Sequence, residues 1–144
     1  MDELLKLSKS EIVSIFNDEL KIFLSELLKI FEQINKDRVN KLLSYKNLIE
    51  TGIIANKELA IEMFSGYIFK KENEDFCKKI SEKDYEYFIK NQDKLDKSNK
   101  FEDLIGIIKE LFLQLSEMNR ENIFGYLENL STLANIFVMK KISK

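Results

Sequence analysis

The apolar residues of this chain recur at intervals of three and four along almost its whole length, and the sequence contains no proline. This spacing gives a helix one apolar face, whereas a strand would need strict alternation. Proline would interrupt helices, so its absence leaves the pattern unbroken. The sequence therefore predicts an all-α chain, with residues 1–144 forming a single compact bundle of five to seven helices.

The stretch 115–138 carries the clearest helix signal. Ser116 is placed to cap it, because the hydroxyl can accept from the free N–H groups of the first turn, and Glu117 suits the positive end of the helix dipole. The side chains expected to face the core are Ile123, Phe124, Leu127, Leu130, Ala134, Phe137 and Val138. We expect this C-terminal helix to be the central helix of the bundle.

A long apolar stripe near the start of the chain predicts the first major helix. Ser8 and Glu11 form a capping-box pattern ahead of it, and the stripe runs to about Asn35. It is wide enough to contact two neighbouring helices, so any part left uncovered would bind a partner. The residues of this candidate partner-binding face are Phe16, Leu20, Phe23, Leu24, Leu28 and Phe31.

Polar residues and glycines divide the middle of the chain. A second helix is expected from about Asp37 to Glu50, ended by Thr51-Gly52 with the glycine as a left-handed C-cap, and Asn56 suits the N-cap of a third. Three more glycines lie inside predicted helices, where they are either tolerated or mark close helix approach: Gly66, Gly106 and Gly125.

Residues 70–100 are rich in both charges and are interpreted as a charged connector. Apolar anchors within it are expected to hold the segment to the core: Phe76 with Ile80, and Tyr85 with Phe88 and Ile89. Ser81 resembles the start of a short helix, and residues 91–99 are expected to be exposed. A further helix is predicted over 98–115.

Missing residue types exclude several kinds of site. Without histidine there is no Ser-His-Asp, Cys-His or His-containing zinc site, and one cysteine allows no internal disulfide. Neither a glycine-rich phosphate loop nor a calcium loop is present. We therefore expect no enzymatic activity, no catalytic residues, no cofactor and no metal, with carboxylate or lysine chemistry as the formal alternative.

Three residue groups are candidates for functional sites, and for each of them a structural role is the favoured interpretation. Cys77 beside two lysines is better explained as a small packing residue than as a redox-sensitive thiol. Glu72, Glu74 and Asp75 are solvated charges rather than metal ligands. The third group is Lys83, Tyr85, Tyr87, Phe88 and Lys90. It mixes aromatic and basic residues, as proteins that bind single-stranded nucleic acid do, but the acidic residues among them would repel the phosphate backbone.

The charge balance and the apolar runs bear on partners and location. The formal net charge is −2, so general affinity for nucleic acid is not expected. No run approaches the 18 apolar residues of a membrane span, and the acidic Met1-Asp2-Glu3 start is unlike a secretory signal. An intracellular location is expected.

The run 115–127, with Phe23-Leu24-Ser25-Glu26-Leu27 and Asp84-Tyr85-Glu86-Tyr87-Phe88, resembles a loosely defined family of short helical proteins of nucleocytoplasmic large DNA viruses. That family has a serine-capped final helix with an aromatic-x-Tyr-Leu element, here Phe124-Gly125-Tyr126-Leu127. Its Phe-Pro-Glu element has no proline here, where the chain reads Phe31-Glu32-Gln33. The resemblance implies a helical fold, a viral origin and a location in the host cytoplasm or the virion, and it transfers no activity.

Two functional hypotheses follow. The first is a non-enzymatic protein–protein interaction module of a large DNA virus, either a virion component or an assembly adaptor, which binds a protein partner or itself. The alternative is a Bcl-2-like antagonist of a host death or signalling factor, although the Asn-Trp-Gly-Arg groove motif of that family is missing. The antagonist needs a groove for an amphipathic helix, so geometry separates the two hypotheses.

Overall fold

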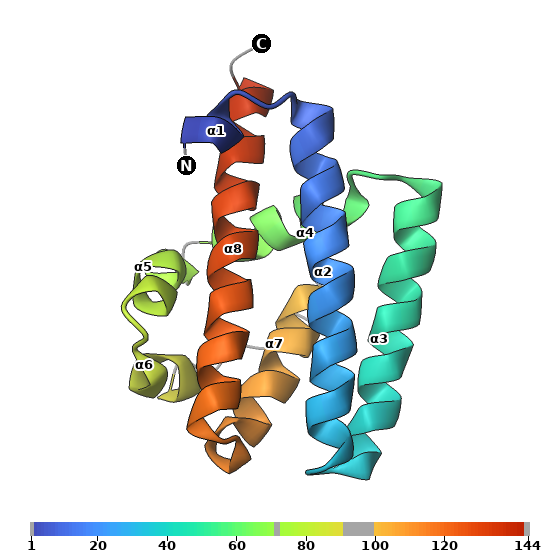
Figure 1. Ribbon diagram of the computed structural model, residues 1–144, viewed down its shortest axis with the longest axis vertical. Coiled ribbons are helices and arrows are strands. Elements are labelled where there is room, and N and C mark those ends of the chain that lie inside the picture. Colours follow the sequence, from blue (N-terminus) through green and yellow to red (C-terminus); the bar gives the residue numbers. More distant parts are fainter. Residues whose placement is uncertain (1, 71–72, 91–99, 143–144) are drawn as a thin grey trace.

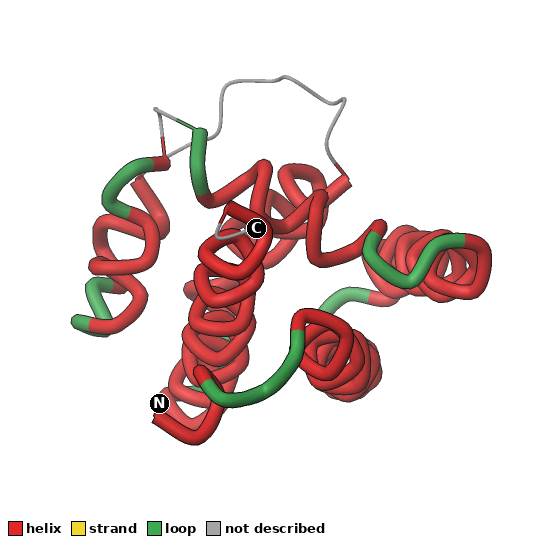
Figure 2. Tube along the Cα trace, turned by 90° about the horizontal axis from the view of Figure 1, so that it is seen from above, coloured by secondary structure: helices red, strands yellow, loops and turns green. Residues whose placement is uncertain are grey.

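The computed structural model describes residues 2–70, 73–90 and 100–142, which form eight α-helices and one 3-10 turn (Figure 1). Helices and loops make up all of these residues, and no strand occurs among them (Figure 2). The all-α prediction is confirmed. The elements are α1 (Asp2–Leu5), α2 (Lys9–Glu32), α3 (Lys36–Ala55), α4 (Leu59–Ile68), α5 (Phe76–Ser81), α6 (Tyr85–Lys90), α7 (Lys100–Leu111), η2 (Phe112–Gln114) and α8 (Glu117–Ile142).

Two long helices, α2 and α8, make the most extensive contact in the structure. α3 packs on the other side of α2, while α4 and α5 pack on α8, and α7 contacts α3 and α4 (Figure 1). The apolar stripe of α2 thus meets two long neighbours, as its width predicted. The centre of the bundle is shared between α2 and α8, whereas the sequence suggested α8 alone.

Local capping signals place the starts of both long helices. The Ser8 hydroxyl accepts from the Glu11 N–H at 3.1 Å, and the Glu11 carboxylate accepts from the Ser8 N–H at 3.0 Å. The Ser116 hydroxyl accepts from the Asn119 N–H at 3.1 Å. Both predicted caps are confirmed, because a cap depends only on residues within one turn.

The helix count exceeds the expected five to seven by one. The helices that the sequence pattern did not separate are α1, with four residues, and α5, with six. A helix this short covers less than two turns, so its apolar spacing cannot establish a period of 3.6 residues.

The predicted end of the second helix is wrong. Gly52 lies inside α3, which continues to Ala55, and its φ is not positive. A Cβ at Gly52 would lie 2.6 Å from Cδ2 of Leu59, so the glycine makes room for the first residue of α4. The predicted N-cap at Asn56 is also wrong, because Glu58 is the residue directly before α4. The side-chain oxygen of Asn56 instead accepts from the Glu58 N–H, at 3.1 Å, in the loop between the two helices. α4 itself begins at Leu59.

The other helical glycines whose surroundings are described differ from Gly52. A Cβ at Gly106 or at Gly125 would meet nothing within 4 Å. Close helix approach therefore explains neither residue, and at both positions the helix tolerates glycine.

The charged connector contains more helix than expected. Residues 76–81 and 85–90 form α5 and α6, and the start predicted at Ser81 is wrong because Ser81 ends α5. Asp84 caps α6 instead, its carboxylate accepting from the Tyr87 N–H at 3.0 Å. The anchors Phe76, Ile80 and Phe88 are each 2% exposed, so the prediction that they bind the core is confirmed. The expected exposure of residues 91–99 lies outside the described residues.

An aromatic cluster fixes α6 to η2 and α8. Tyr85 and Phe88 each contact Phe112 and Phe124, with ring centroids 4.8 to 5.3 Å apart. These edge and tilted contacts add to the free energy gained by burying the rings. Two of the three aromatic residues of α6, Tyr85 and Phe88, therefore face the core.

None of the described helices has the length and apolar character needed to cross a membrane.

Candidate binding cleft

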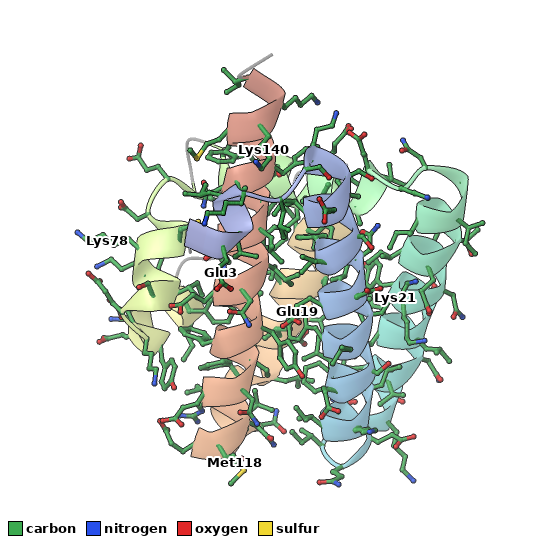
Figure 3. All side chains as sticks on the ribbon, turned by 45° about the horizontal axis from the view of Figure 1, so that its top comes forward. Glu3, Glu19, Lys21, Lys78, Met118 and Lys140 are labelled. Carbon is green, nitrogen blue, oxygen red and sulfur yellow. The ribbon has the colours of Figure 1, made fainter. Side chains whose placement is uncertain are left out.

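An open cleft of about 370 Å³ lies between α2 and the first half of α8. Carboxylates from both helices line it, namely Glu19 and Glu26 from α2 and Glu121 from α8. Three amide side chains of α8 also line it: Asn119, Asn122 and Asn129. Figure 3 shows Glu19 between the two helices, with Met118 at the end of α8 nearer the cleft.

The cleft is hollow at Gly125, on its α8 wall. Gly125 is exposed, and a Cβ built there would point into open space with no atom within 4 Å. Because a helical glycine costs about 1 kcal/mol relative to alanine, this position is one where the helix gives up stability and leaves space at its surface.

Two stacked aromatic rings form the floor of the cleft. The Phe23 and Tyr126 ring centroids lie 5.1 Å apart with an interplanar angle of 28°. Phe23 is 1% exposed, whereas Tyr126 is half-buried and reaches the cleft. The accessible aromatic surface of the cleft is thus the Tyr126 ring, which stacks on the buried Phe23 and lies among the polar lining residues.

The local charge of the cleft is negative. Burial raises the pKa of the Tyr126 phenol, and the carboxylates of Glu26 and Glu19 raise that pKa further. Glu19 accepts a hydrogen bond from Nδ2 of Asn129 at 3.3 Å, which joins α2 to α8. Among the described residues, the cleft carboxylate that forms an ion pair is Glu26. Its Oε1 lies 3.6 Å from Nζ of Lys29 at the surface. The carboxylates therefore keep most of their capacity to bind an added cation.

A nearby arginine is turned away from the cleft. Nε and an Nη of Arg120 donate to the carbonyl oxygens of Phe112 and Leu113, at 3.1 and 2.9 Å. Its guanidinium also lies 5.5 Å from the Phe112 ring. Arg120 thus binds the end of η2, and the cleft retains its negative potential.

The partner-binding face predicted on α2 is almost entirely internal. Phe16, Leu20, Leu24 and Phe31 are fully buried, and Leu28 is half-buried against the core. The stripe is covered by α8, α3 and α4 of the same chain. Its width is therefore explained by packing within the bundle. Phe23, at 1% exposure, is the one member of the predicted face that lines the cleft.

No sequence motif marks the polar cleft residues as a site. Glu19 and Glu26 are two helical turns apart on α2, a spacing that puts them on one side of that helix. Tyr126 was noted within the aromatic-x-Tyr-Leu element, without a role. The missing information was that these parts of α2 and α8 lie together.

The structure also shows the surroundings of the other candidate groups. Cys77 is half-buried against the core, with Nδ2 of Asn135 3.8 Å from its sulfur. Within the described residues no three acidic, cysteine or histidine side chains are grouped to hold a metal ion. Tyr85 and Phe88 pack in the aromatic cluster, so these two rings are not displayed for stacking on nucleic acid bases.

Comparison with protein-family models, with curated proteins and with solved structures finds no match to this chain. The chemistry of the cleft is therefore what indicates a function. Carboxylates around an aromatic floor suit a cationic group with an apolar stem, such as a lysine or arginine side chain.

Proposed function

We propose that this protein is a non-enzymatic protein–protein interaction module that binds a basic segment of a partner protein in the cleft between α2 and α8. The observation that carries the proposal is the combination of Glu19, Glu26 and Glu121 with the stacked Phe23 and Tyr126 rings. A role inside the infected cell or the virion, as an assembly adaptor or structural component of a large DNA virus, is part of the same proposal.

Magnitudes indicate how the cleft would contribute. A cation over an exposed aromatic ring contributes about 0.5–1 kcal/mol, and each exposed ion pair adds up to about 1 kcal/mol. One anchored side chain therefore supplies a few kcal/mol, which corresponds to roughly millimolar affinity. The cleft would serve as the anchor for a longer segment that also contacts the surface around it.

The chemistry of the cleft favours this module over a Bcl-2-like antagonist. A groove for an amphipathic helix must expose apolar side chains to the ligand. Here Phe23, Leu27 and Ile123 are at most 1% exposed, whereas the glutamates lie above them at the surface. The accessible part of the cleft is thus suited to charge.

Peptide binding tests the proposal. We expect a fluorescent Lys/Arg-rich peptide to bind the protein, with affinity that falls as salt is raised. The double substitution Glu19→Gln and Glu26→Gln should weaken binding about tenfold, since two charge contacts of roughly 0.7 kcal/mol each are lost. The matched control is Glu62→Gln with Glu74→Gln, two exposed glutamates outside the cleft.

Three outcomes would contradict the proposal: no binding of the basic peptide, equal loss in both double variants, or preference for an uncharged amphipathic helix. The last would favour the antagonist instead. In cells, affinity purification with mass spectrometry should recover proteins that are lost with the Glu19 and Glu26 substitutions. Co-purified nucleic acid that survives high salt would also contradict the proposal.

A further inference from the structure

Four residues form a stripe along the α8 wall of the cleft, at positions i, i+4, i+7 and i+11. They are Met118, Asn122, Gly125 and Asn129, and the last three line the cleft. With 3.6 residues per turn, these positions lie within about 60° of one another around α8. The stripe is open to solvent, since all four residues are exposed and Met118 is 71% exposed.

α2 carries a matching stripe on the opposite wall, at positions i, i+3 and i+7. Glu19 and Glu26 line the cleft, and Ile22 lies one helical turn from each of them and is 52% exposed. The two glutamates are about 10 Å apart along α2, at 1.5 Å per residue. The hydrogen bond from Asn129 to Glu19 holds the two stripes side by side.

A short helix of the chain itself covers the continuation of the α8 stripe. Seven and eleven residues beyond Asn129 are Ile136, which is 2% exposed, and Lys140, whose Nζ donates to the Leu5 carbonyl oxygen at 2.9 Å. Figure 1 shows α1 in front of this part of α8, while α4 and α7 lie behind the two long helices. Within the described chain, one end of this surface is thus occupied by a helix and the cleft end is open.

The open end has the length and shape to accept another helix. Met118 and Asn129 are about 16 Å apart along α8, which is the length of a helix of three turns. Gly125 lies within this span, and a Cβ there would meet nothing within 4 Å. Small residues at a contact let two helices approach closely, because the distance between packed helix axes depends on the side chains between them.

The charge of the open end defines what kind of helix fits. Three carboxylates line the cleft, those of Glu19, Glu26 and Glu121, and the cation paired with one of them is Lys29. Acids therefore outnumber bases on this surface. A bound helix should carry cations toward the cleft and an apolar side chain toward Ile22.

We propose that the basic segment bound in the cleft is an α-helix of about three turns that lies along α2 and α8. Lys or Arg at positions i and i+7 of that helix face Glu19 and Glu26, with an apolar residue between them against Ile22. The same seven-residue spacing on both helices places both cations opposite carboxylates at once, whichever way the bound chain runs. This inference rests on the proposed function of the cleft, and basic rather than apolar side chains enter it.

Three peptides of the same composition test the inference by fluorescence anisotropy at low salt. The first has arginines at i and i+7 with a leucine at i+4 and a proline at its end. The second moves one arginine to the opposite side of the helix, and the third moves the proline to the centre, where it breaks the helix. The first should bind about tenfold more tightly than either of the others, because it alone meets both carboxylates as a helix.

A cross-linked form of the first peptide adds a direct test of helical binding. The cross-link joins side chains on the face that points away from the cleft and holds the peptide as a helix. Less ordering is then required on binding, so the affinity should rise. A cross-linked peptide that binds more weakly than the flexible one overturns the inference.

Variants of the protein test the two contacts that depend on a bound helix. Ile22→Ser removes the apolar contact, and Gly125→Leu fills the space that allows close approach. Each should weaken binding of the first peptide about tenfold and change binding of the centrally broken peptide much less. The matched controls are Ile54→Ser and Thr51→Leu, at exposed positions of α3 outside the cleft, and both should bind as the wild type does.

Circular dichroism should show that all four variants remain helical. Equal affinity for the three peptides overturns the inference. So does a control variant that loses as much affinity as its counterpart in the cleft.

Failure of this inference can be told apart from failure of the proposed function. If all three peptides bind equally and lose affinity with Glu19→Gln and Glu26→Gln, the cleft remains a site for basic segments that are not helical. If none of the peptides binds, both proposals are contradicted.

Discussion

Lys83 is the one non-glycine residue of the described chain with a positive φ, at 56°. Its N–H donates to the Ile80 carbonyl oxygen at 3.1 Å, and the Asp84 N–H donates to that of Lys79 at 2.9 Å. These two bonds form a Schellman motif, in which glycine is the usual residue at the left-handed position. The turn between α5 and α6 therefore includes a lysine backbone under strain.

Replacing this lysine should stabilise the protein. We expect Lys83→Gly to raise the free energy of unfolding by about 1 kcal/mol, because the left-handed conformation costs a non-glycine residue about 1–2 kcal/mol. The matched control is Lys78→Gly in the exposed part of α5, where glycine should cost up to about 1 kcal/mol. Urea denaturation measures both changes, and a loss of stability for both variants would contradict this account of the turn.

The described glycines should respond differently to alanine. Gly125→Ala should stabilise the protein by about 1 kcal/mol, since the methyl group meets no atom within 4 Å. Gly52→Ala should gain less, because its Cβ would lie 2.6 Å from Cδ2 of Leu59. Adding Leu59→Ala removes that clash, so the gain from Gly52→Ala should be larger in the Leu59→Ala background. Equal gains in both backgrounds would show that Leu59 does not limit position 52.

At the scale of elements, a buried tyrosine links α3 to α7. Burial, the hydrogen bond to the Asp103 carboxylate and the charge of that carboxylate together raise the pKa of Tyr45 to about 12. Nearby, an Nη of Arg38 on α3 lies 2.6 Å from a carboxylate oxygen of Glu110 on α7. Polar contacts thus hold these two helices together where the apolar core reaches the surface.

The raised pKa of Tyr45 predicts that the folded protein loses stability at alkaline pH. An unfolded tyrosine has a pKa near 10, so above that pH the unfolded chain releases a proton that the folded chain retains. The stabilisation is fully present below about pH 10 and is lost as the pH rises toward 12, with a total on the order of 2 kcal/mol. Tyr45→Phe should flatten this part of the curve of unfolding free energy against pH. An unchanged slope in the variant would contradict the prediction.

The aromatic cluster predicts how α6 is held. Phe88→Ala should remove the ring that contacts both Phe112 and Phe124, at a cost of about 3–5 kcal/mol. Phe88→Leu keeps most of the volume and should cost much less. Hydrogen exchange should show faster exchange of the α6 amides in Phe88→Ala. Unchanged protection of α6 would mean that other contacts hold this helix.

The elements that the sequence predicted are those set by neighbouring residues. Ser8 and Ser116 were identified as caps because each bonds within its own turn. Gly52 was misassigned because the same residue type ends helices and also allows close packing, and the position of Leu59 decides between these. Serine and aspartate both commonly cap helices, so Ser81 and Asp84 were equally suitable. The left-handed backbone at Lys83 ends α5 after Ser81, and Asp84 is therefore the residue that caps α6.

At the scale of the whole molecule, the site was harder to predict than the fold. The apolar stripe of α2 indicated burial correctly, but whether another helix or a partner covers it depends on tertiary packing. The cleft needs Glu19 and Tyr126 together, and these belong to helices at opposite ends of the sequence. No periodicity within one helix brings such residues together, so the structure was required to identify the cleft.

The central claim is that the space between α2 and α8 binds a basic segment of a protein, and amide chemical-shift mapping by NMR tests it most directly. On titration of ¹⁵N-labelled protein with the Lys/Arg-rich peptide at low salt, we predict that the largest shifts occur at Gly125, Tyr126 and Asn129 on α8 and at Glu19 and Glu26 on α2. Added salt should reverse them. Shifts confined to the outer face of α3, or no shifts at all, would contradict the claim.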